Sequence, residues 1–285
     1  MSKGTLYLLA TPIGNLGDMT LRGIEVLKSV DLIAAEDTRN SIKLLNHFDV
    51  HTPMTSYHEH NRFEKAEELV ALLLEGKDIA CITDAGTPGI SDPGEVLVKR
   101  CVEEEIPVTS VPGPAALISA LILSGFSTRR FRFEGFLPAE KKERENVLKG
   151  LEKDPATLVF YEAPHRLLKT VGYLYAALGE RRAAFCKELT KKHEDICRLP
   201  LSEALEFYEK EAPRGEYVIV VEGADTEKLK AEEQQAFSAL SLEAHMQRYL
   251  DAGLDRKEAM KKVAEDRGVQ KREIYRALLT EESGD

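Results

Sequence analysis

The sequence predicts an α/β protein with two α/β domains and a small helical appendage at the C-terminal end. Three observations carry this prediction. Short apolar runs alternate with amphipathic stretches over residues 5–125, residues 157–221 repeat the alternation with closer strand spacing, and residues 242–279 show only helical patterns. A chain of 285 residues is long enough for about two domains with separate cores. The predicted domains are 1–128, 129–225 and 226–285.

The first domain is predicted to hold a mostly parallel sheet covered on both faces by helices. Its strands are expected near residues 5–10, 31–35, 52–56, 78–83 and 107–111. A helix over Glu59–Leu74 places Ala66, Leu69, Val70, Leu73 and Leu74 on one face at helical spacing. Strand and helix alternation of this length is typical of parallel sheets.

The second domain is predicted to hold a mixed sheet, because several of its strands follow one another too closely for helical crossovers. Residues 131–138, which contain Gly135 and Pro138, are interpreted as an interdomain connection. Beyond them we expect helices near 140–152, 165–178 and 201–210, and strands near 157–161, 183–187, 196–199 and 217–221.

The C-terminal part is predicted to be a linker followed by helices. Residues 226–235 are polar, charged and free of glycine, and we interpret them as the linker. Helices are expected at 242–250, 256–267 and 271–279, with Gly253 and Gly268 at the breaks. This arrangement fits a helix-turn-helix, and it fits a three-helix packing appendage equally well.

Glycine- and proline-rich loops follow several of the predicted strands. The richest, Asp84–Gly94, holds three glycines and two prolines directly after the apolar run 79–82. Neither a helix nor a strand can continue through such a segment. Similar loops begin at Thr11 and Pro112, and a fourth strand runs into Glu162. Ligands bind at the carboxyl edge of open α/β sheets, so these loops predict one shared cleft.

Composition restricts the class of protein. Hydrophobic residues make up 43% and charged residues 31% of the chain, and no apolar run approaches the roughly 20 residues that cross a bilayer. The sequence shows no secretion signal, and its four cysteines lack CxxC spacing, so a cytoplasmic protein with reduced thiols is expected. The net charge of −10 requires any RNA contact to come from local basic patches.

Several common sites are excluded by spacing. The chain has no GxxxxGK[ST] phosphate loop, no GxGxxG dinucleotide fingerprint and no GxSxG elbow. His58 and His60 lie two residues apart, which places them on opposite sides of a strand, and no metal site is predicted. A cleft of backbone donors and acceptors with few fixed charges suits a nucleoside with a zwitterionic amino-acid tail.

Nine motifs then occur in one order along the chain: TPIGNLGDMTLRG, LIAAEDTRNSIKLL, SYHEHN, ITDAGTPGISDPG, VPGPAALISAL, FEGFLP, FYEAPHRL, KELTKKHE and RGEYVIVVEG. Together, from Thr5 to about Gly223, they resemble the small-subunit ribosomal RNA methyltransferases of the tetrapyrrole methylase superfamily, the class III methyltransferases. The resemblance implies S-adenosylmethionine-dependent 2′-O-methylation of a decoding-centre cytidine in 16S ribosomal RNA. It also implies action within the small ribosomal subunit by a homodimer.

The same resemblance assigns the methyl-donor site to residues of both domains. The implied donor contacts are Ile13, Gly86, Thr87, Ile90, Ala115, Ala116, Glu162, Leu189, Gly215 and Glu216. Other members of the superfamily have Gly-Asp-Pro where this chain has Gly86-Thr87-Pro88, so the carboxylate is displaced to Asp84 or lost. Because a sulfonium methyl group is already activated, the enzyme mainly needs to align the acceptor oxygen, methyl carbon and sulfur.

A ribose hydroxyl is a poor nucleophile, and a general base or a polarising cation would assist it. Just past the second strand, Asp37 and Arg39 are the best candidates, together with their neighbours Glu36 and Asn40, and His58 is a further one. Glu36 and Asp37 could instead cap the following helix, with Arg39 paired to either carboxylate.

RNA contacts are predicted from two basic patches. The first contains Arg129, Arg130 and Arg132, and the second, in the C-terminal helices, contains Lys271 and Arg272. Acidic residues are interleaved in both, so each also fits an ordinary solvated surface.

Two other functions fit parts of the sequence. The superfamily's shared donor cleft allows a methyltransferase that acts on a tetrapyrrole. A catalytically inactive RNA-binding assembly factor is the second alternative, although decay of a site would be expected to replace its glycine loops.

Overall fold

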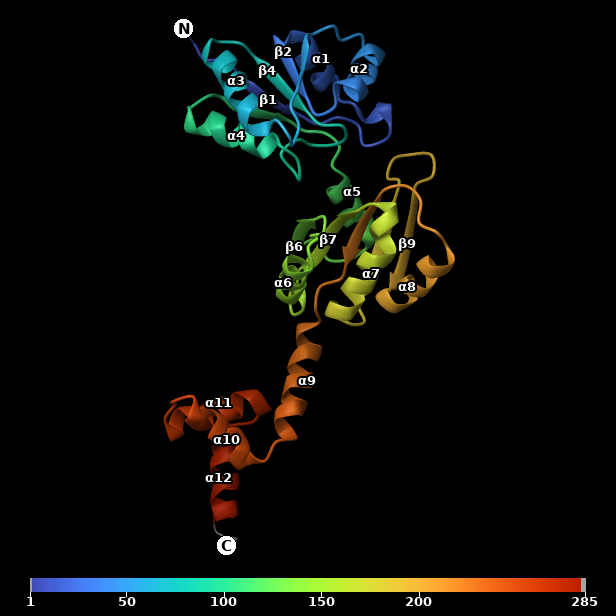
Figure 1. Ribbon diagram of the computed structural model, residues 1–285. Coiled ribbons are helices and arrows are strands. Elements are labelled where there is room, and N and C mark those ends of the chain that lie inside the picture. The colour runs from blue at the N-terminus through green and yellow to red at the C-terminus, as the bar shows by residue number, and fades with distance from the viewer. Residues whose placement is uncertain (1, 283–285) are drawn as a thin grey trace. The chain divides into compact units, whose positions relative to one another are not determined.

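The computed structural model describes residues 2–282, and its first sheet is parallel throughout (Figure 1). The strands lie in the order β3-β2-β4-β1-β5. Their bounds are β1 Leu6–Leu9, β2 Leu32–Ala35, β3 Met54–Ser56, β4 Ile79–Ile82 and β5 Val108–Val111. The central strand β4 is buried at all four positions, as expected for a parallel strand covered on both faces.

Helices cover both faces of this sheet. On one face, α3 (Arg62–Leu74) and α4 (Gly94–Glu103) bury Leu69 and Leu97. On the other face, α1 (Leu21–Ser29) and α2 (Thr38–His47) contribute Leu27 and Leu45, and a short helix η1 (Leu16–Asp18) precedes α1. We call this sheet and its helices the first lobe.

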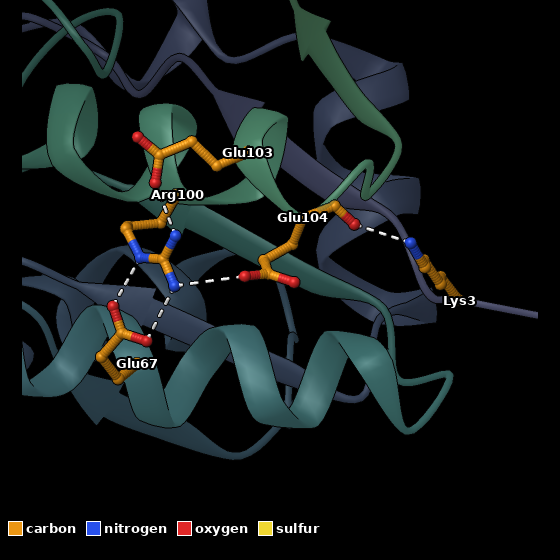
Figure 2. Close-up of polar contacts among 5 residues, drawn as sticks. All are labelled: Lys3, Glu67, Arg100, Glu103 and Glu104. Atoms are coloured by element: carbon orange, nitrogen blue, oxygen red, sulfur yellow. Dashed lines mark hydrogen bonds and ion pairs between the residues drawn. The ribbon is translucent and has the colours of Figure 1, made fainter.

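An ion-pair network joins α3 to α4 (Figure 2). The Arg100 guanidinium donates to both carboxylate oxygens of Glu67, at 2.6 and 3.1 Å, and it also reaches Glu103 and Glu104. The Lys3 ammonium donates to the Glu104 carbonyl at 2.6 Å. Two-point pairing of this kind fixes the two helices against each other more specifically than a single charge contact would.

The second sheet is mixed, as predicted, in the order β6-β7-β10-β8-β9. Only β6 and β7 are parallel. The strands are β6 Phe131–Gly135, β7 Thr157–Glu162, β8 Arg182–Lys187, β9 Asp195–Pro200 and β10 Tyr217–Val221. With α5 (Ala116–Ser124), α6 (Lys141–Leu151), α7 (Pro164–Leu178) and α8 (Leu201–Lys210), they form the second lobe.

Residues 131–138 are not merely a connection, since they contain the edge strand β6. Gly135 adopts a left-handed backbone with φ 62°, and the β6–β7 register shifts between Phe133 and Gly135. The glycine and Pro138 that suggested a connector therefore mark an irregularity at the strand's end.

The chain divides into two compact units. The larger contains both lobes, residues 1–149 and 156–222, and the smaller contains residues 150–155 and 223–285. We call the smaller one the C-terminal unit. The predicted boundary near residue 128 between the two α/β domains stays a prediction.

The segment predicted as a linker is helical. Helix α9 spans Thr226–Ser238, with the Asp225 carboxylate accepting from the amides of Glu227 and Lys228 at its start. Its polar sequence is rich in Glu, Lys, Gln and Ala, which are strong helix formers, and it contains no breaker. The segment was interpreted as a linker because of its polarity, and its helix propensity was not taken into account.

Three more helices complete the C-terminal unit: α10 (Leu242–Asp251), α11 (Arg256–Arg267) and α12 (Lys271–Glu282). A capping box between Asp255 and Glu258 starts α11, and Gly268 ends it with φ 66°. The buried His245 ring stacks on Phe237 of α9 at 4.6 Å, and its two nitrogens contact Asp266 and Arg267 of α11. Among residues 2–282, no helix combines the length and apolarity needed to cross a membrane.

Candidate active site

A pocket of about 290 Å³ opens between the two lobes of the larger unit. The first lobe contributes the loops that follow β1 and β4. The second lobe contributes the start of α5, the ends of β7 and β8 and the start of β10. The lining residues are Ile13, Ala85, Gly86, Thr87, Ile90, Ala115, Ala116, Leu117, Phe136, Tyr161, Glu162, Ala163, Cys186, Glu188, Leu189, Lys191, Glu216, Tyr217 and Val218.

Backbone hydrogen bonds join the first-lobe loops to one another. Thr11 and Gly86 form an isolated antiparallel bridge, with N···O distances of 2.9 and 3.0 Å. Gly86 has φ 88°, and a Cβ atom there would lie 3.3 Å from Ile13 Cγ2. The Thr87 hydroxyl donates to the Pro114 carbonyl at 2.9 Å. Glycine at this position therefore supplies both a left-handed turn and a close approach of two loops.

The Asp92 carboxylate holds the rest of the Asp84–Gly94 loop. It accepts from the amides of Gly89, Ile90 and Gly94 at 2.8, 2.9 and 2.8 Å. A carboxylate that satisfies several local amides substitutes for regular secondary structure. The loop is therefore an ordered wall of the pocket despite its content of glycine and proline.

The second-lobe wall contains a strained turn after β8. Glu188 and Thr190 both have left-handed backbones, with φ 50° and 65°. The Glu188 carboxylate accepts from the amide of Glu216 at 2.9 Å, and a Cβ atom at Gly215 would come within 2.5 Å of its Cγ. Non-glycine residues adopt this conformation only where the surroundings enforce it, and such positions cluster at functional sites.

Lys191 lines the pocket from this turn. Its ammonium donates to Glu188 at 2.9 Å and to Glu216 at 2.8 Å. The hydrogen bond from the Glu216 amide, together with that from Lys191, holds the pKa of Glu188 below its ordinary value. Partial burial opposes the charge of Lys191, yet the two carboxylates raise its pKa. One cation and two anions thus occupy the same side of the pocket.

Glu162 places a third carboxylate in the wall. The residue is 2% exposed, and its carboxylate accepts from the Ala163 amide at 2.9 Å and from the Thr170 hydroxyl. The Arg166 side chain lies 3.6 Å away. These partners compensate for the cost of burying the charge.

The structure brings together the residues predicted to hold the methyl donor. All of them line the pocket except Gly215, which lies next to the pocket residue Glu216. Asp84, the alternative carboxylate for the Gly-Asp-Pro pattern, is not among the lining residues, and it accepts from the Asn40 side chain at 3.2 Å.

Asp37 and Arg39 lie just past β2 and pair with each other. The Asp37 carboxylate accepts from the Arg39 amide at 2.8 Å, which caps α2, and from the Arg39 guanidinium at 2.8 Å. These bonds lower the pKa of Asp37 to about 2. The alternative that Asp37 caps the helix is therefore realised, and its carboxylate is a weak proton acceptor.

The neighbouring Glu36 differs from Asp37 in its burial and in the direction of its pKa shift. It is partly buried, and its Oε2 accepts from the Asp84 amide at 3.2 Å. Burial, followed by repulsion from the carboxylates of Asp84, Asp92 and Asp37, raises its pKa against the opposing Asp84 hydrogen bond. A carboxylate with a raised pKa accepts a proton more readily than a strongly paired one.

His58 lies at the same edge, just beyond β3. Its amide donates to the Asn61 side chain at 2.8 Å, and its ring lies 5.9 Å from that of His60. Within the described residues, the buried Nδ1 of His58 has no hydrogen-bond partner. No group of three or more His, Cys, Asp or Glu side chains in residues 2–282 is arranged to hold a metal ion.

The predicted RNA-binding residues occupy two regions. Arg129 and Arg130 are exposed before β6, and Arg132 on β6 pairs with Glu134. In the C-terminal unit, Arg272 is exposed, and Lys271 donates to the Lys257 carbonyl at 3.0 Å.

Residues 5–205 match the family described as Tetrapyrrole (Corrin/Porphyrin) Methylases. The chain belongs to this family. Its membership, the pocket between two α/β lobes and the names of its relatives identify it as a methyltransferase.

Two curated relatives extend the similarity over nearly the whole chain. A protein of Halalkalibacterium halodurans named ribosomal RNA small subunit methyltransferase I is 48% identical, covering 96% of this chain and 94% of its own. A protein of the same name from Synechocystis is 46% identical, covering 97% and 98%.

Solved structures show the same fold at low identity. Diphthine synthase matches with a TM-score of 0.62 at 13% identity, covering 77% of this chain and 89% of its own. Uroporphyrin-III-C-methyltransferase from Thermus thermophilus matches with a TM-score of 0.55 at 19% identity, covering 77% and 94%. The tetrapyrrole methylase fold predicted from the motifs is thus confirmed.

Sequence reasoning did not assign several lining residues to the pocket, chiefly Phe136, Tyr161, Glu188 and Lys191, and it interpreted Glu188 as the ion-pair partner of Lys187. All four lie within the motifs FEGFLP, FYEAPHRL and KELTKKHE. Their roles depend on proximity between segments far apart in the chain, which the motifs by themselves do not contain.

Proposed function

We propose that this methyltransferase transfers a methyl group from S-adenosylmethionine to the 2′-hydroxyl of a decoding-centre cytidine in 16S ribosomal RNA. The observation that carries the proposal is the near full-length similarity, at 40–48% identity, to relatives named ribosomal RNA small subunit methyltransferase I. The pocket and the polar edge beside it supply the groups that this reaction needs.

The pocket fits the methyl donor. Ala115 and Ala116 leave room that larger side chains would fill, and Gly86 lets the loops of the first lobe approach each other. Glu162 and Glu216 supply negative charge for a positively charged ligand. The proposed contacts are those predicted from the sequence, with Glu188 and Lys191 added. S-adenosylmethionine supplies a methyl group that its sulfonium already activates, so the protein's task is to hold and orient the reactants.

The acceptor hydroxyl needs a group that takes its proton. We propose that this group comes from the edge formed by β2, β3 and β4. There the pKa of Glu36 is raised while that of the paired Asp37 is lowered, and the buried Nδ1 of His58 has no hydrogen-bond partner among the described residues. Asp37 would then hold Arg39, whose 88% exposed side chain is free to approach a phosphate.

The RNA would be held by Arg129, Arg130 and Arg132 and, through the C-terminal unit, by Lys271 and Arg272. The net charge of −10 makes such local patches necessary. Substrate selection would use the 2′-hydroxyl, which DNA lacks, in a nucleotide turned out of its stack.

A homodimer is also proposed, and α5 supports it. This helix is almost wholly apolar, and it buries Leu117, Ala120 and Leu121 against the second sheet. Its other side leaves Ile118 45% exposed and Ile122 65% exposed. A second copy of the chain would cover this face, and Ile122→Lys should then yield a monomer in light-scattering measurements. A wild-type protein that is already monomeric would rule the dimer out.

Labelled S-adenosylmethionine separates the proposed function from its alternatives. Incubation with small ribosomal subunits from a strain lacking the protein should label 16S RNA at one ribose, and a porphyrinoid should take up no label. Label on the porphyrinoid would support a tetrapyrrole methyltransferase instead. Binding of RNA without any binding of the donor would support the inactive assembly factor.

A further inference from the structure

Phe136 lies at the mouth of the pocket rather than in its depth. It lines the pocket, yet 51% of it is exposed, whereas Glu162 and Leu189 of the same pocket are 2% and 6% exposed. A large aromatic side chain that remains half-exposed beside a pocket offers a surface for a flat partner. Nucleobases pair with such aromatic faces by stacking.

The segment that carries Phe136 is firmly held. Leu137 is 1% exposed, and its carbonyl accepts from the Arg166 guanidinium at 2.6 Å. The Arg144 guanidinium donates to the next two carbonyls, of Pro138 at 3.1 Å and of Ala139 at 2.9 Å. Two arginines thus fix the backbone beside an exposed ring, which reduces the entropy cost when a ligand binds.

The protein also supports the ring from one side. Tyr161 contacts Phe136 edge to face, with ring centroids 5.8 Å apart, and it contacts Phe133 in the same way at 4.9 Å. Tyr161 is partly buried and lines the same pocket. Phe136 is therefore the outermost member of a small aromatic cluster, and half of its surface remains available to a partner.

A second exposed apolar side chain borders the same mouth from the first lobe. Ile90 is 42% exposed and lines the pocket. The residues adjacent to Ile90 and Phe136 meet directly, because a Cβ atom at Gly135 would lie 3.0 Å from Ser91 Oγ. Both Gly135 and Ser91 have left-handed backbones, with φ 62° and 64°. The two loops thus approach each other where their exposed side chains emerge.

We propose that Phe136 is a positioning residue that stacks on the unpaired nucleobase whose ribose accepts the methyl group. This inference rests on the proposed function, since it requires an RNA acceptor. The acceptor ribose must reach the methyl group in the pocket, so the attached base must lie at or near the mouth. Arg129 and Arg130 precede β6 whereas Phe136 follows it, roughly 20 Å away at about 3.3 Å per strand residue, so these arginines would reach phosphates a few nucleotides from the stacked base.

The test compares Phe136→Ala and Phe136→Tyr with the wild-type enzyme. The matched control is Phe63→Ala, which removes a 67% exposed ring on α3 outside the pocket. Rates of methyl transfer to small ribosomal subunits are measured at saturating donor, and the dissociation constant of S-adenosylmethionine is measured by calorimetry. Circular dichroism confirms that each variant is folded.

Phe136→Ala should lower kcat/KM for the RNA by about 5- to 150-fold, the usual cost of removing the stacking partner of one base. Phe136→Tyr should restore most of this activity, and the control should match the wild type. Donor affinity should be unchanged in all of them.

Three results would overturn the proposal: an unimpaired Phe136→Ala variant, a fall in its donor affinity that accounts for the reduced rate, or a Phe136→Leu variant as active as Phe136→Tyr. A wild-type enzyme that methylates no RNA would instead refute the proposed function, and the inference with it.

Discussion

Gly14 lies directly against the side chain of Lys191, so that a Cβ atom on Gly14 would come within 2.3 Å of the Lys191 Cγ. The contact joins the loop after β1 in the first lobe to the strained turn after β8 in the second. The lysine's ammonium meanwhile pairs with Glu188 and Glu216. The two loops can approach each other on this side of the pocket because Gly14, which has no side chain, leaves room for the long side chain of Lys191.

Gly14→Ala should weaken donor binding several-fold, because the added methyl group displaces Lys191 across the pocket wall. The double variant Gly14→Ala, Lys191→Ala should bind the donor better than the sum of the two single effects predicts, since the clash is then absent. Calorimetric titration of all four proteins checks this coupling. Strict additivity would show that the two residues act independently.

Gly86→Val should abolish donor binding while the lobes remain folded. The new side chain would meet Ile13 and the Pro114 carbonyl, at a backbone φ of 88° that costs a β-branched residue about 1–2 kcal/mol. Gly125→Val is the matched control, because Gly125 has φ 80° and open space around it. If Gly86→Val binds the donor with normal affinity, the Asp84–Gly94 loop is not part of the donor site.

Glu36→Gln should raise the melting temperature at pH 7 and lower kcat. The folded state raises the pKa of Glu36 above its unfolded value, so ionisation of this carboxylate costs folding free energy at pH 7. The advantage of the glutamine should disappear as the pH falls through that raised pKa, because the wild-type carboxyl then becomes neutral too. Melting curves between pH 4 and pH 8 test the effect on stability. Methylation rates, compared with those of Asp37→Asn, separately test the effect on kcat. A variant that gains no stability at pH 7 contradicts the assigned burial cost, and one with full activity excludes Glu36 as the proton acceptor.

Charge reversal at Lys271 and Arg272 should weaken RNA binding and flatten its dependence on salt, by about one unit of log–log slope for each phosphate that is no longer neutralised. Lys99→Glu, at an exposed position on α4, should bind RNA normally and controls for the change in net charge of each single reversal. Removal of residues 226–285 should weaken RNA binding in the same way without altering donor affinity, because none of the described residues 226–282 lines the pocket. If RNA affinity and methylation both survive the deletion, the C-terminal unit has no binding role.

Local patterns predicted most of the secondary structure. The helices Leu201–Lys210 and Arg256–Arg267 and the strand Tyr217–Val221 were predicted to the residue. The helix ends are marked in the sequence by Pro200, Asp255 and Gly268, and the strand is a continuous apolar run. The strand β6 was missed because its register shifts between Phe133 and Gly135, and because Gly135 at its end and Pro138 beyond it are typical of a loop. Helix α9 was missed because it lacks the apolar stripe by which helices are usually recognised.

The site was predictable only in part, and for a physical reason. Glycine loops reveal where backbone must turn sharply, so the segment around Gly86 could be located from composition and motif alone. The close packing of Lys191 against Gly14 and the hydrogen bond from Arg166 to the Leu137 carbonyl both join segments that no local pattern connects. The same limit applies to the titration of Glu36, whose pKa is raised by burial and by the carboxylates of Asp84 and Asp92 on a distant loop, whereas Asp37 pairs with the nearby Arg39.

Helix α5 follows a first-lobe strand, yet its apolar side chains pack in the core of the second lobe. The connection between them is Pro112-Gly113-Pro114, and Thr87 is hydrogen-bonded to its last carbonyl. Any swing of one lobe relative to the other must bend the chain at these three residues, where two proline rings restrict the available torsions. A product release that required the lobes to separate would therefore have to break the Thr87–Pro114 hydrogen bond and displace Ala115 and Ala116 of the pocket lining.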